Sequence, residues 1–362
     1  MYYHIALTLI PGIGPVLARN LVSYCGSAEA VFKTRRKKLL EIPGIGDVAA
    51  TAIAGHQIFD QVDKEMQFIE QHHIRCFTYT EPDYPKRLHQ CPDAPTVLFY
   101  QGTADVNAAR IIGVVGTRRA TPYGRRICEE IVQDLAGDDI LVISGLAYGI
   151  DIAAHRACIK HQVPTIGVLA HGLDRIYPWA HRETAAKMRE QGGLLTEFIS
   201  GTNPDRQNFP RRNRIVAGML DGLVVVETGA DGGAVITALL ADDYHRDVMA
   251  FPGSVHQMYS AGCHKLIKQH KATLVENADD IRTVMGWNLE KNDKGIQTTL
   301  FPELDPDEQK IFDILMQEKQ VYVDELQSKS ALSPGTLAGV LLNMEFKGAL
   351  ISLPGKMYAL NR

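Results

Sequence analysis

The sequence predicts an α/β protein with a Rossmann-like, doubly wound and mainly parallel sheet, a small helical domain before it and a winged helix after it. Three observations support this fold class. Apolar runs alternate with helical segments over residues 81–286, a glycine-containing motif occurs twice near the N-terminus, and three helical segments precede a hairpin at the C-terminus. A chain of 362 residues can hold more than one hydrophobic core, so we expect several domains.

The repeated motif predicts an N-terminal helix-hairpin-helix (SAM-like) domain over residues 1–72. The sequence Ile-Pro-Gly-Ile-Gly stands at residues 10–14 and again at 42–46, each time before apolar residues at helical spacing. Such turns can offer backbone N–H groups to DNA phosphates. However, Pro15 lacks an N–H and Asp47 places an acid where a phosphate would approach. We therefore expect a structural or protein-contacting role for this repeat.

The central segment, residues 81–286, carries the signature of a parallel sheet. Continuous apolar runs stand at 111–115, 141–143, 165–169, 223–226 and 248–251, as in strands that are buried on both faces. Helical patterns near 122–137, 149–161, 181–191, 232–245 and 262–270 lie between or after them. This alternation predicts repeated β-α-β units.

Residues 287–304 are polar and lack sustained periodicity, which predicts a linker. Residues 305–362 then predict a winged helix, with Ser333 and Pro334 starting its third helix. This domain has six cations and eight acids, and Pro334–Phe346, in the position of a recognition helix, has no Lys or Arg with which to read a base edge. We expect it to bind protein rather than DNA.

The overall composition narrows the class of protein. The net charge is −4, so any DNA site must be a local patch. The six cysteines form no zinc-type spacing, and no segment has the length and apolarity of a membrane span. We expect a cytoplasmic protein with reduced thiols, without a metal or a cofactor and without membrane association.

The loop after the first central strand is strongly basic. Five arginines and no acid lie in the range 110–126, and Arg118 and Arg119 directly follow Gly116-Thr117. Ligands of open α/β sheets bind beyond the carboxyl ends of strands, where helix N-termini attract anions. The loop therefore predicts phosphate binding. A dinucleotide site is disfavoured, because the glycine spacing differs from G-x-G-x-x-G and the second strand ends at Ser144-Gly145 rather than at an acid.

A second basic cluster mixes cations with an aromatic ring. It consists of Arg206, Phe209, Arg211, Arg212, Asn213 and Arg214, and the prolines at 204 and 210 predict an extended approach. An unpaired base can stack on an aromatic ring while guanidinium groups hold its phosphates, so the mixture favours single-stranded nucleic acid. The alternative is structural, with Phe209 in the core and Arg214 in a buried ion pair, for instance with Glu227.

Two enzymatic interpretations remain as alternatives. Ser144, Asp151 and His155 could suggest a hydrolase, but an acid and a base four residues apart on one helix seldom serve one nucleophile. We expect Asp151 at a helix N-terminus and His155 packed beside it. The loop 227–233 resembles that of Rossmann-like nucleotide phosphoribohydrolases, which carry an acid early in the next helix, whereas residues 234–238 contain none. We therefore expect no catalysis, and keep this enzyme class as the alternative.

Four motifs resemble the DNA-processing protein A family, also called Smf. They are Val-Gly-Thr-Arg at 115–118, Ile-Ser-Gly-Leu-Ala-Tyr-Gly-Ile-Asp at 143–151, Gly-Leu-Asp at 172–174 with Tyr-Pro at 177–178, and Phe-Pro-Arg-Arg-Asn-Arg-Ile at 209–215. The resemblance implies a dimeric protein that binds and protects single-stranded DNA in natural transformation, loads the recombinase RecA onto it, and has no established catalysis.

The resemblance also implies a DNA pocket, and it matches that pocket at Arg118, Gly201, Arg206, Phe209 and Asn213-Arg214. Asp-Gly-Gly at 231–233 and His264 depart from the family pattern. With the loop residues argued above, the predicted DNA site comprises Gly116, Thr117, Arg118, Arg119, Ser144, Gly145, Gly201, Arg206, Phe209, Arg211, Arg212, Asn213 and Arg214.

Overall fold

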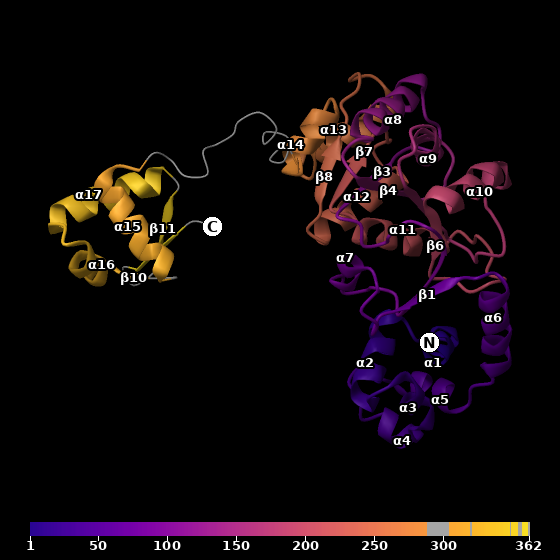
Figure 1. The fold of residues 1–362 in the computed structure, drawn as a ribbon. Coiled ribbons are helices and arrows are strands. Elements are labelled where there is room, and N and C mark those ends of the chain that lie inside the picture. Colours follow the sequence, from indigo (N-terminus) through magenta and orange to yellow (C-terminus); the bar gives the residue numbers. More distant parts are fainter. Residues whose placement is uncertain (288–303, 319–320, 348, 354–356, 361–362) are drawn as a thin grey trace. The chain divides into compact units, whose positions relative to one another are not determined.

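The computed structural model describes residues 1–287, 304–318, 321–347, 349–353 and 357–360 (Figure 1). Its chain forms two compact units, residues 1–287 and 288–362. The predicted linker, 287–304, lies almost wholly outside the described residues. Within those residues, no helix combines the length and the apolarity needed to cross a bilayer.

A nine-stranded sheet forms the centre of the first unit. The strands from β6 to β9 in the sheet order pair in parallel, whereas β2 pairs antiparallel to both β1 and β6. The predicted mainly parallel sheet is confirmed. The sequence interpretation missed β1, β2, β6 and β9; of these, β1, β6 and β9 have four residues or fewer. In spatial order the strands are β1 (Arg75–Thr78), β2 (Val97–Gly102), β6 (Gly193–Thr196), β5 (Thr165–Val168), β4 (Ile140–Ser144), β3 (Arg110–Val115), β7 (Gly222–Val225), β8 (Asp247–Ala250) and β9 (Thr273–Leu274).

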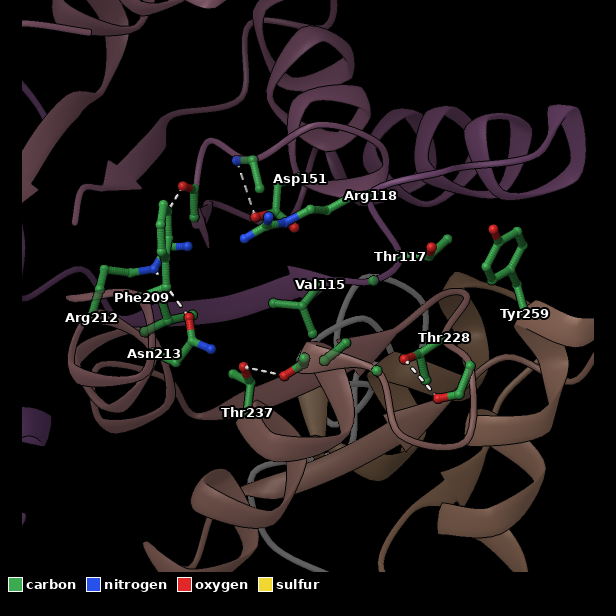
Figure 2. Close-up of a pocket in the computed structure, with 18 residues that line it drawn as sticks. Val115, Thr117, Arg118, Asp151, Phe209, Arg212, Asn213, Thr228, Thr237 and Tyr259 are labelled. Atoms are coloured by element: carbon green, nitrogen blue, oxygen red, sulfur yellow. Dashed lines mark hydrogen bonds between the residues drawn. The ribbon is translucent and has the colours of Figure 1, made fainter. Parts of the chain in front are cut away.

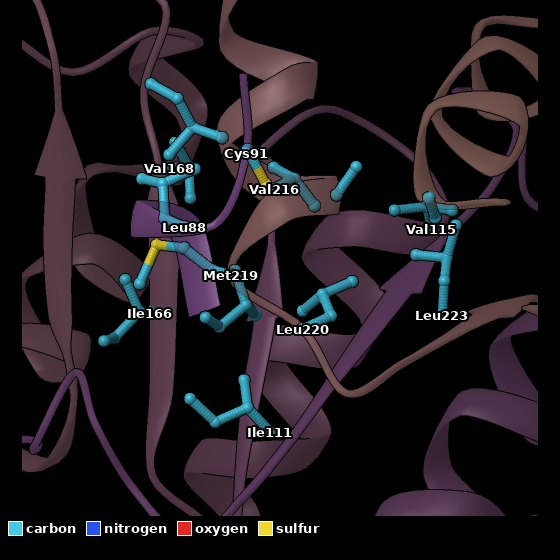
Figure 3. Packing of buried hydrophobic residues seen from close by; sticks show 14 of the residues in the cluster. Leu88, Cys91, Ile111, Val115, Ile166, Val168, Val216, Met219, Leu220 and Leu223 are labelled. Carbon is cyan, nitrogen blue, oxygen red and sulfur yellow. The ribbon is translucent and has the colours of Figure 1, made fainter. Parts of the chain in front are cut away.

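Helices cover both faces of this sheet, as a doubly wound fold requires (Figure 1). On one face, α7, α11, α12 and α13 pack on a core that includes Ile111, Val168 and Leu223 (Figure 3). On the other face, α8, α9 and α14 pack on Ile112 and Val224. These helices, with α10 and two 3-10 turns, are α7 (Lys86–His89), α8 (Pro122–Leu135), α9 (Ile150–Lys160), η1 (Trp179–His181), α10 (Arg182–Gln191), α11 (Asn208–Gly218), α12 (Gly233–Asp243), η2 (Met258–Ser260), α13 (Ala261–Lys268) and α14 (Ala278–Val284).

Helix α11 corrects the sequence interpretation, which expected extended chain around Phe209. The structure has a helix from Asn208 to Gly218, with Pro210 in its first turn. A proline is tolerated there because the first N–H groups of a helix have no intrahelical acceptor. The second basic cluster therefore lies largely on a helix, and its neighbouring side chains point in different directions.

The N-terminal segment contains the two predicted hairpins. Helix α2 begins directly after Gly14 and α5 directly after Gly46, and the turns place Gly12 and Gly44 at φ values of +81° and +83°. Residues of α1 and α6 share a hydrophobic cluster with β2 and with the loop after β4, so this segment packs against the sheet. Its helices are α1 (Tyr2–Leu9), α2 (Pro15–Cys25), α3 (Ala28–Lys33), α4 (Arg36–Leu39), α5 (Asp47–Ala54) and α6 (Phe59–Gln71).

The described residues of the second unit form three helices and a three-stranded sheet in the order β10-β12-β11. Ile311, Leu337, Met344 and Leu350 are among the residues of its core. The predicted winged helix is confirmed. Its elements are α15 (Pro306–Gln317), β10 (Val321–Tyr322), α16 (Val323–Ser330), α17 (Pro334–Phe346), β11 (Leu350–Leu353) and β12 (Met357–Leu360).

Candidate nucleic-acid interface

The basic loop after β3 is held in place by Glu227, which follows β7. The Thr117 N–H donates to the Glu227 carbonyl oxygen at 2.6 Å. The buried Glu227 carboxylate accepts from the Thr121 N–H at 3.0 Å and from the Thr121 hydroxyl at 2.6 Å. Arg118 and Arg119 are exposed between these anchors. Their side chains therefore project from a backbone that is fixed on both sides.

A hollow of about 330 Å³ opens beyond the carboxyl ends of β3, β4 and β7. Figure 2 shows its lining side chains converging from the loop after β3, from α9, from α11 and from the start of α12. Gly232 and Gly233 stand where α12 begins, and no side chain caps that helix. Uncapped N–H groups at a helix N-terminus favour an anion. Asp231, in contrast, is 97 % exposed and lies 3.8 Å from Lys265.

Arg118 stands at the junction of this hollow with two others. Its guanidinium lies 5.2 Å from the centre of the Phe209 ring, and the Tyr177 ring lies 6.3 Å from the Phe209 ring. A second hollow is lined by Arg118, Tyr148, Tyr177 and Phe209. A third, of about 590 Å³, is lined by Arg118, Arg119, Arg125 and Arg156, and also by the acid Glu129. We call the combined surface of Arg118, Arg119, Arg125, Arg156, Tyr148, Tyr177 and Phe209 the basic-aromatic track.

Four residues of this track were absent from the predicted site: Arg125, Tyr148, Arg156 and Tyr177. Tyr148 and Tyr177 are about half exposed. Both tyrosines lie inside the motifs that carry the family resemblance, so the sequence contained a signal for them. Arg156 had no such signal, because its position beside the loop after β3 depends on how α9 packs.

Ser144 does not present its hydroxyl to the surface as a DNA site would require. Its side chain is completely buried, and its hydroxyl donates to the Val114 carbonyl oxygen at 2.6 Å. This geometry also removes the hydrolase interpretation. His155 is buried and bonded through Nδ1 to the Thr165 hydroxyl at 2.7 Å, and burial lowers the pKa of His155 to about 3. His155 is thus packed in the protein interior, as expected, and its hydrogen-bond partner is Thr165.

Arg212 is buried in the wall of the main hollow. Its guanidinium donates to the Gly145 carbonyl and, at 2.5 Å, to the Val168 carbonyl, while its Nε donates to Asn213 Oδ1 at 3.1 Å. A Cβ at Gly145 would lie 2.6 Å from this guanidinium, so only glycine leaves it room. Burial lowers the pKa of Arg212 to about 10, and burial raises the pKa of Asp151, an effect that the Arg212 charge opposes.

Arg211 and Arg214 turn away from the main hollow, because neighbouring helical residues point about 100° apart. Arg214 is buried and donates to the Glu197 carboxylate and to the Asp93 carbonyl. The suggested ion pair of Arg214 therefore exists, but with Glu197 and not with Glu227. Arg211 is exposed, lies 3.7 Å from Glu197 and lines a separate hollow beside the first hairpin.

Gly201 and Arg206 are exposed but are not among the residues that line the main hollow. Gly201 donates its N–H to Asp174 Oδ1 at 2.9 Å. The structure thus brings together Gly116, Thr117, Arg118, Gly145, Phe209, Arg212 and Asn213 at the main hollow, with Arg119 at an adjoining one. In the described ranges, no group of three or more His, Cys, Asp or Glu side chains could hold a metal ion.

The fold and the site define a Rossmann-like α/β protein with a basic, aromatic-lined hollow at the carboxyl edge of its sheet. In the chain, a helix-hairpin-helix tandem precedes this domain and a winged helix follows it. The chain belongs to the DNA recombination-mediator protein A family, whose model matches residues 75–286. The DprA winged helix domain matches residues 298–356, and a SAM-like helix-hairpin-helix tandem matches residues 5–54.

Relatives and solved structures agree with this assignment. Protein Smf of Synechocystis is 30% identical over 394 aligned positions, which cover 98% of each chain. The crystal structure of DNA processing protein A from Streptococcus pneumoniae superposes with a TM-score of 0.69 at 30% identity, covering 78% of this chain and 97% of that one. The protein from Helicobacter pylori, at 24% identity and a TM-score of 0.54, covers 61% of this chain and 98% of that one and shares the fold.

Proposed function

We propose that this protein binds single-stranded DNA along the basic-aromatic track. We further propose that it acts as a homodimeric, cytoplasmic recombination mediator, protecting incoming single strands in natural transformation and loading the recombinase RecA onto them. The observation that carries the DNA site is the position of Arg118, which lines three adjoining hollows and faces the ring of Phe209. The membership of the recombination-mediator family supports the cellular role.

The track suits a polymer better than a single nucleotide. Exposed guanidinium groups can neutralise successive phosphates, and exposed aromatic rings can stack successive unpaired bases. Duplex DNA keeps its bases paired and stacked, so rings of this kind gain nothing from it. The solved structure from Helicobacter pylori was reported for its single-stranded DNA binding mode, which supports the same ligand here.

The residues of the predicted site take two different roles in this proposal. Arg118, Arg119, Phe209 and Asn213 face the ligand, and Gly116, Thr117 and Gly145 form the adjacent wall. Gly201 and Arg206 lie on exposed chain outside the hollows of the track. Ser144, Arg212 and Arg214 act as positioning residues, because their polar groups bond within the protein interior. Arg211 is left outside the DNA path.

A nucleotide-cleaving enzyme is the alternative. The acid that lines the main hollow is Asp151, a buried carboxylate that accepts the Ala147 N–H at 3.3 Å. The first turn of α12 contains no acid. Glycosidic cleavage usually needs a pair of carboxylates or an acid at the departing base. We therefore propose binding without hydrolysis.

Salt dependence separates the two functions. Log affinity for an oligothymidylate should fall with log salt by about 0.7 for each phosphate contact, so several contacts give a steep slope, whereas a nucleoside monophosphate gives a shallow one. Release of free base from nucleoside monophosphates should stay at the uncatalysed rate. A shallow slope together with base release would establish the enzyme instead.

Recombinase loading needs its own measurement. We expect the protein to accelerate RecA filament assembly on an oligonucleotide that is already coated with single-stranded DNA-binding protein. Arg118→Ala should lose this effect together with DNA affinity. If wild-type protein binds the oligonucleotide but leaves filament assembly unchanged, DNA binding stands and the mediator role does not.

A further inference from the structure

Helix α17 of the winged helix is apolar on two opposite faces. Leu337, Val340, Leu341 and Met344 are buried in the core of the second unit. On the opposite face, Leu342 is 53% exposed and Phe346 is 83% exposed. A helix that is apolar all round is normally buried all round. Within the described residues, Leu342 and Phe346 therefore remain largely exposed on the outer face of α17.

The outer face has a definite shape. Gly335, Gly339, Leu342 and Phe346 follow one another at intervals of four, three and four residues, which keeps them on one side of the helix. A Cβ at Gly335 or Gly339 would meet no atom within 4 Å. The N-terminal half of the face is thus an open notch, and the C-terminal half is a pair of projecting side chains.

We propose that α17 pairs antiparallel with α17 of a second copy of this chain. With a rise of about 1.5 Å per residue, Gly335 and Phe346 lie equally far, about 8 Å, on either side of the helix midpoint. Gly339 and Leu342 are likewise equidistant from it, at about 2 Å. A twofold axis at that midpoint seats the partner's Phe346 over Gly335 and the partner's Leu342 over Gly339. Each bulky side chain then fills a notch, as a self-complementary interface demands.

The charges on α17 favour this occupant over DNA. The helix carries no Lys or Arg, so a phosphate backbone finds no counter-charge on it. Its acid, Glu345, flanks the outer face, and the antiparallel register brings it near the partner's Ala338. The two Glu345 side chains are about 13 Å apart along the helix axis. This distance exceeds the Debye length of roughly 8 Å at physiological salt, so their mutual repulsion is largely screened.

The surface buried between the two α17 helices is small, and its area determines how tightly two copies can associate. Four large side chains, two from each copy, bury at most several hundred Å², below the roughly 1,200 Å² of a stable interface. The pairing should therefore be weak and concentration-dependent. The proposal uses no residue of the proposed DNA site, because Leu342 and Phe346 belong to the second unit and the basic-aromatic track to the first.

Sedimentation velocity of the full chain over a range of concentrations tests the pairing. Phe346→Asp should raise the dissociation constant of the concentration-dependent step at least tenfold. Met316→Asp is the matched control, since Met316 is 54% exposed on α15 of the same unit. Any association through the first unit is common to all three proteins. If Phe346→Asp sediments like wild type, the proposal is wrong.

Disulfide trapping tests the register. Ala338→Cys mixed with Glu345→Cys should form a mixed cross-linked dimer several-fold faster than Glu345→Cys does with itself. The wild-type chain provides the background, because Cys25 and Cys76 are partly exposed. Equal trapping in both samples would overturn the antiparallel arrangement.

Loss of duplex-DNA affinity in Phe346→Asp without a change in association would show that α17 reads DNA. Single-strand affinity should be unchanged in Phe346→Asp, so this test can fail while the proposed DNA function stands.

Discussion

Replacing Phe209 with alanine tests whether its ring stacks on a DNA base or belongs to the protein core. Phe209 is only partly buried, stands on the first turn of α11 and lines two adjoining hollows. Its ring has the Arg118 guanidinium 5.2 Å from its centre. If a base stacks on this ring, Phe209→Ala should weaken single-strand binding by about 1 to 3 kcal/mol. Since about 1.4 kcal/mol is a factor of ten, the dissociation constant should rise roughly 5- to 150-fold.

The cost to folding should be smaller than that of a core phenylalanine. A fully buried ring costs about 3–5 kcal/mol when truncated. Phe209 is partly exposed, and its cation–π contact with the exposed Arg118 contributes about 0.5–1 kcal/mol. The free energy of unfolding should therefore fall by less than about 3 kcal/mol.

Fluorescence anisotropy with a labelled oligothymidylate at one salt concentration measures the binding change, and denaturant unfolding measures the stability change. Phe209→Tyr keeps an aromatic face and should bind within a few-fold of wild type. Phe209→Leu keeps apolar volume without that face and should rescue only part of the loss. Full affinity in Phe209→Leu, or a stability loss of the size seen for a core ring, would refute the stacking role.

Three further outcomes are expected. Arg118→Ala should weaken binding equally across unrelated oligonucleotides and lower the slope of log affinity against log salt by about 0.7. Arg211→Ala is the control and should change neither quantity, because Arg211 lies beside Glu197. Electrophoretic shifts at several salt concentrations measure both. A chain that ends after Trp287 should keep single-strand affinity within a few-fold, and a large loss in a folded truncation would place the winged helix on DNA. Burial lowers the pKa of His155 from 6.5 to about 3, so between these values the unfolded chain binds more protons and stability rises with pH. Acidification from pH 6.5 to 5.5 should therefore lower the free energy of unfolding of the wild type by about 1 kcal/mol more than that of His155→Asn. The same pH dependence of stability in both proteins would contradict this.

The sequence by itself determined the fold class, five of the nine strands of the central sheet and the turns of the N-terminal repeat. Runs such as 111–115 and 223–226 predict strands buried on both faces, and the two Ile-Pro-Gly-Ile-Gly motifs predict turns that start helices. These signals are local, because hydrophobic periodicity and glycine conformation act within a few residues. For the same reason the basic loop after β3 could be placed at the carboxyl edge of the sheet.

Only the tertiary structure decided which polar side chains face that edge. Phe209, Arg212 and Arg214 are close in sequence, yet one lines the hollow with its ring, one is buried in its wall and one pairs with Glu197. Pro210 led the sequence interpretation away from helix α11, because a proline in the first turn of a helix cannot be told by sequence from a proline in extended chain. The outer face of α17 was equally hidden, because apolar spacing alone does not say which of two apolar faces packs inward. Burial is a property of what surrounds a residue, and its surroundings come from distant parts of the chain.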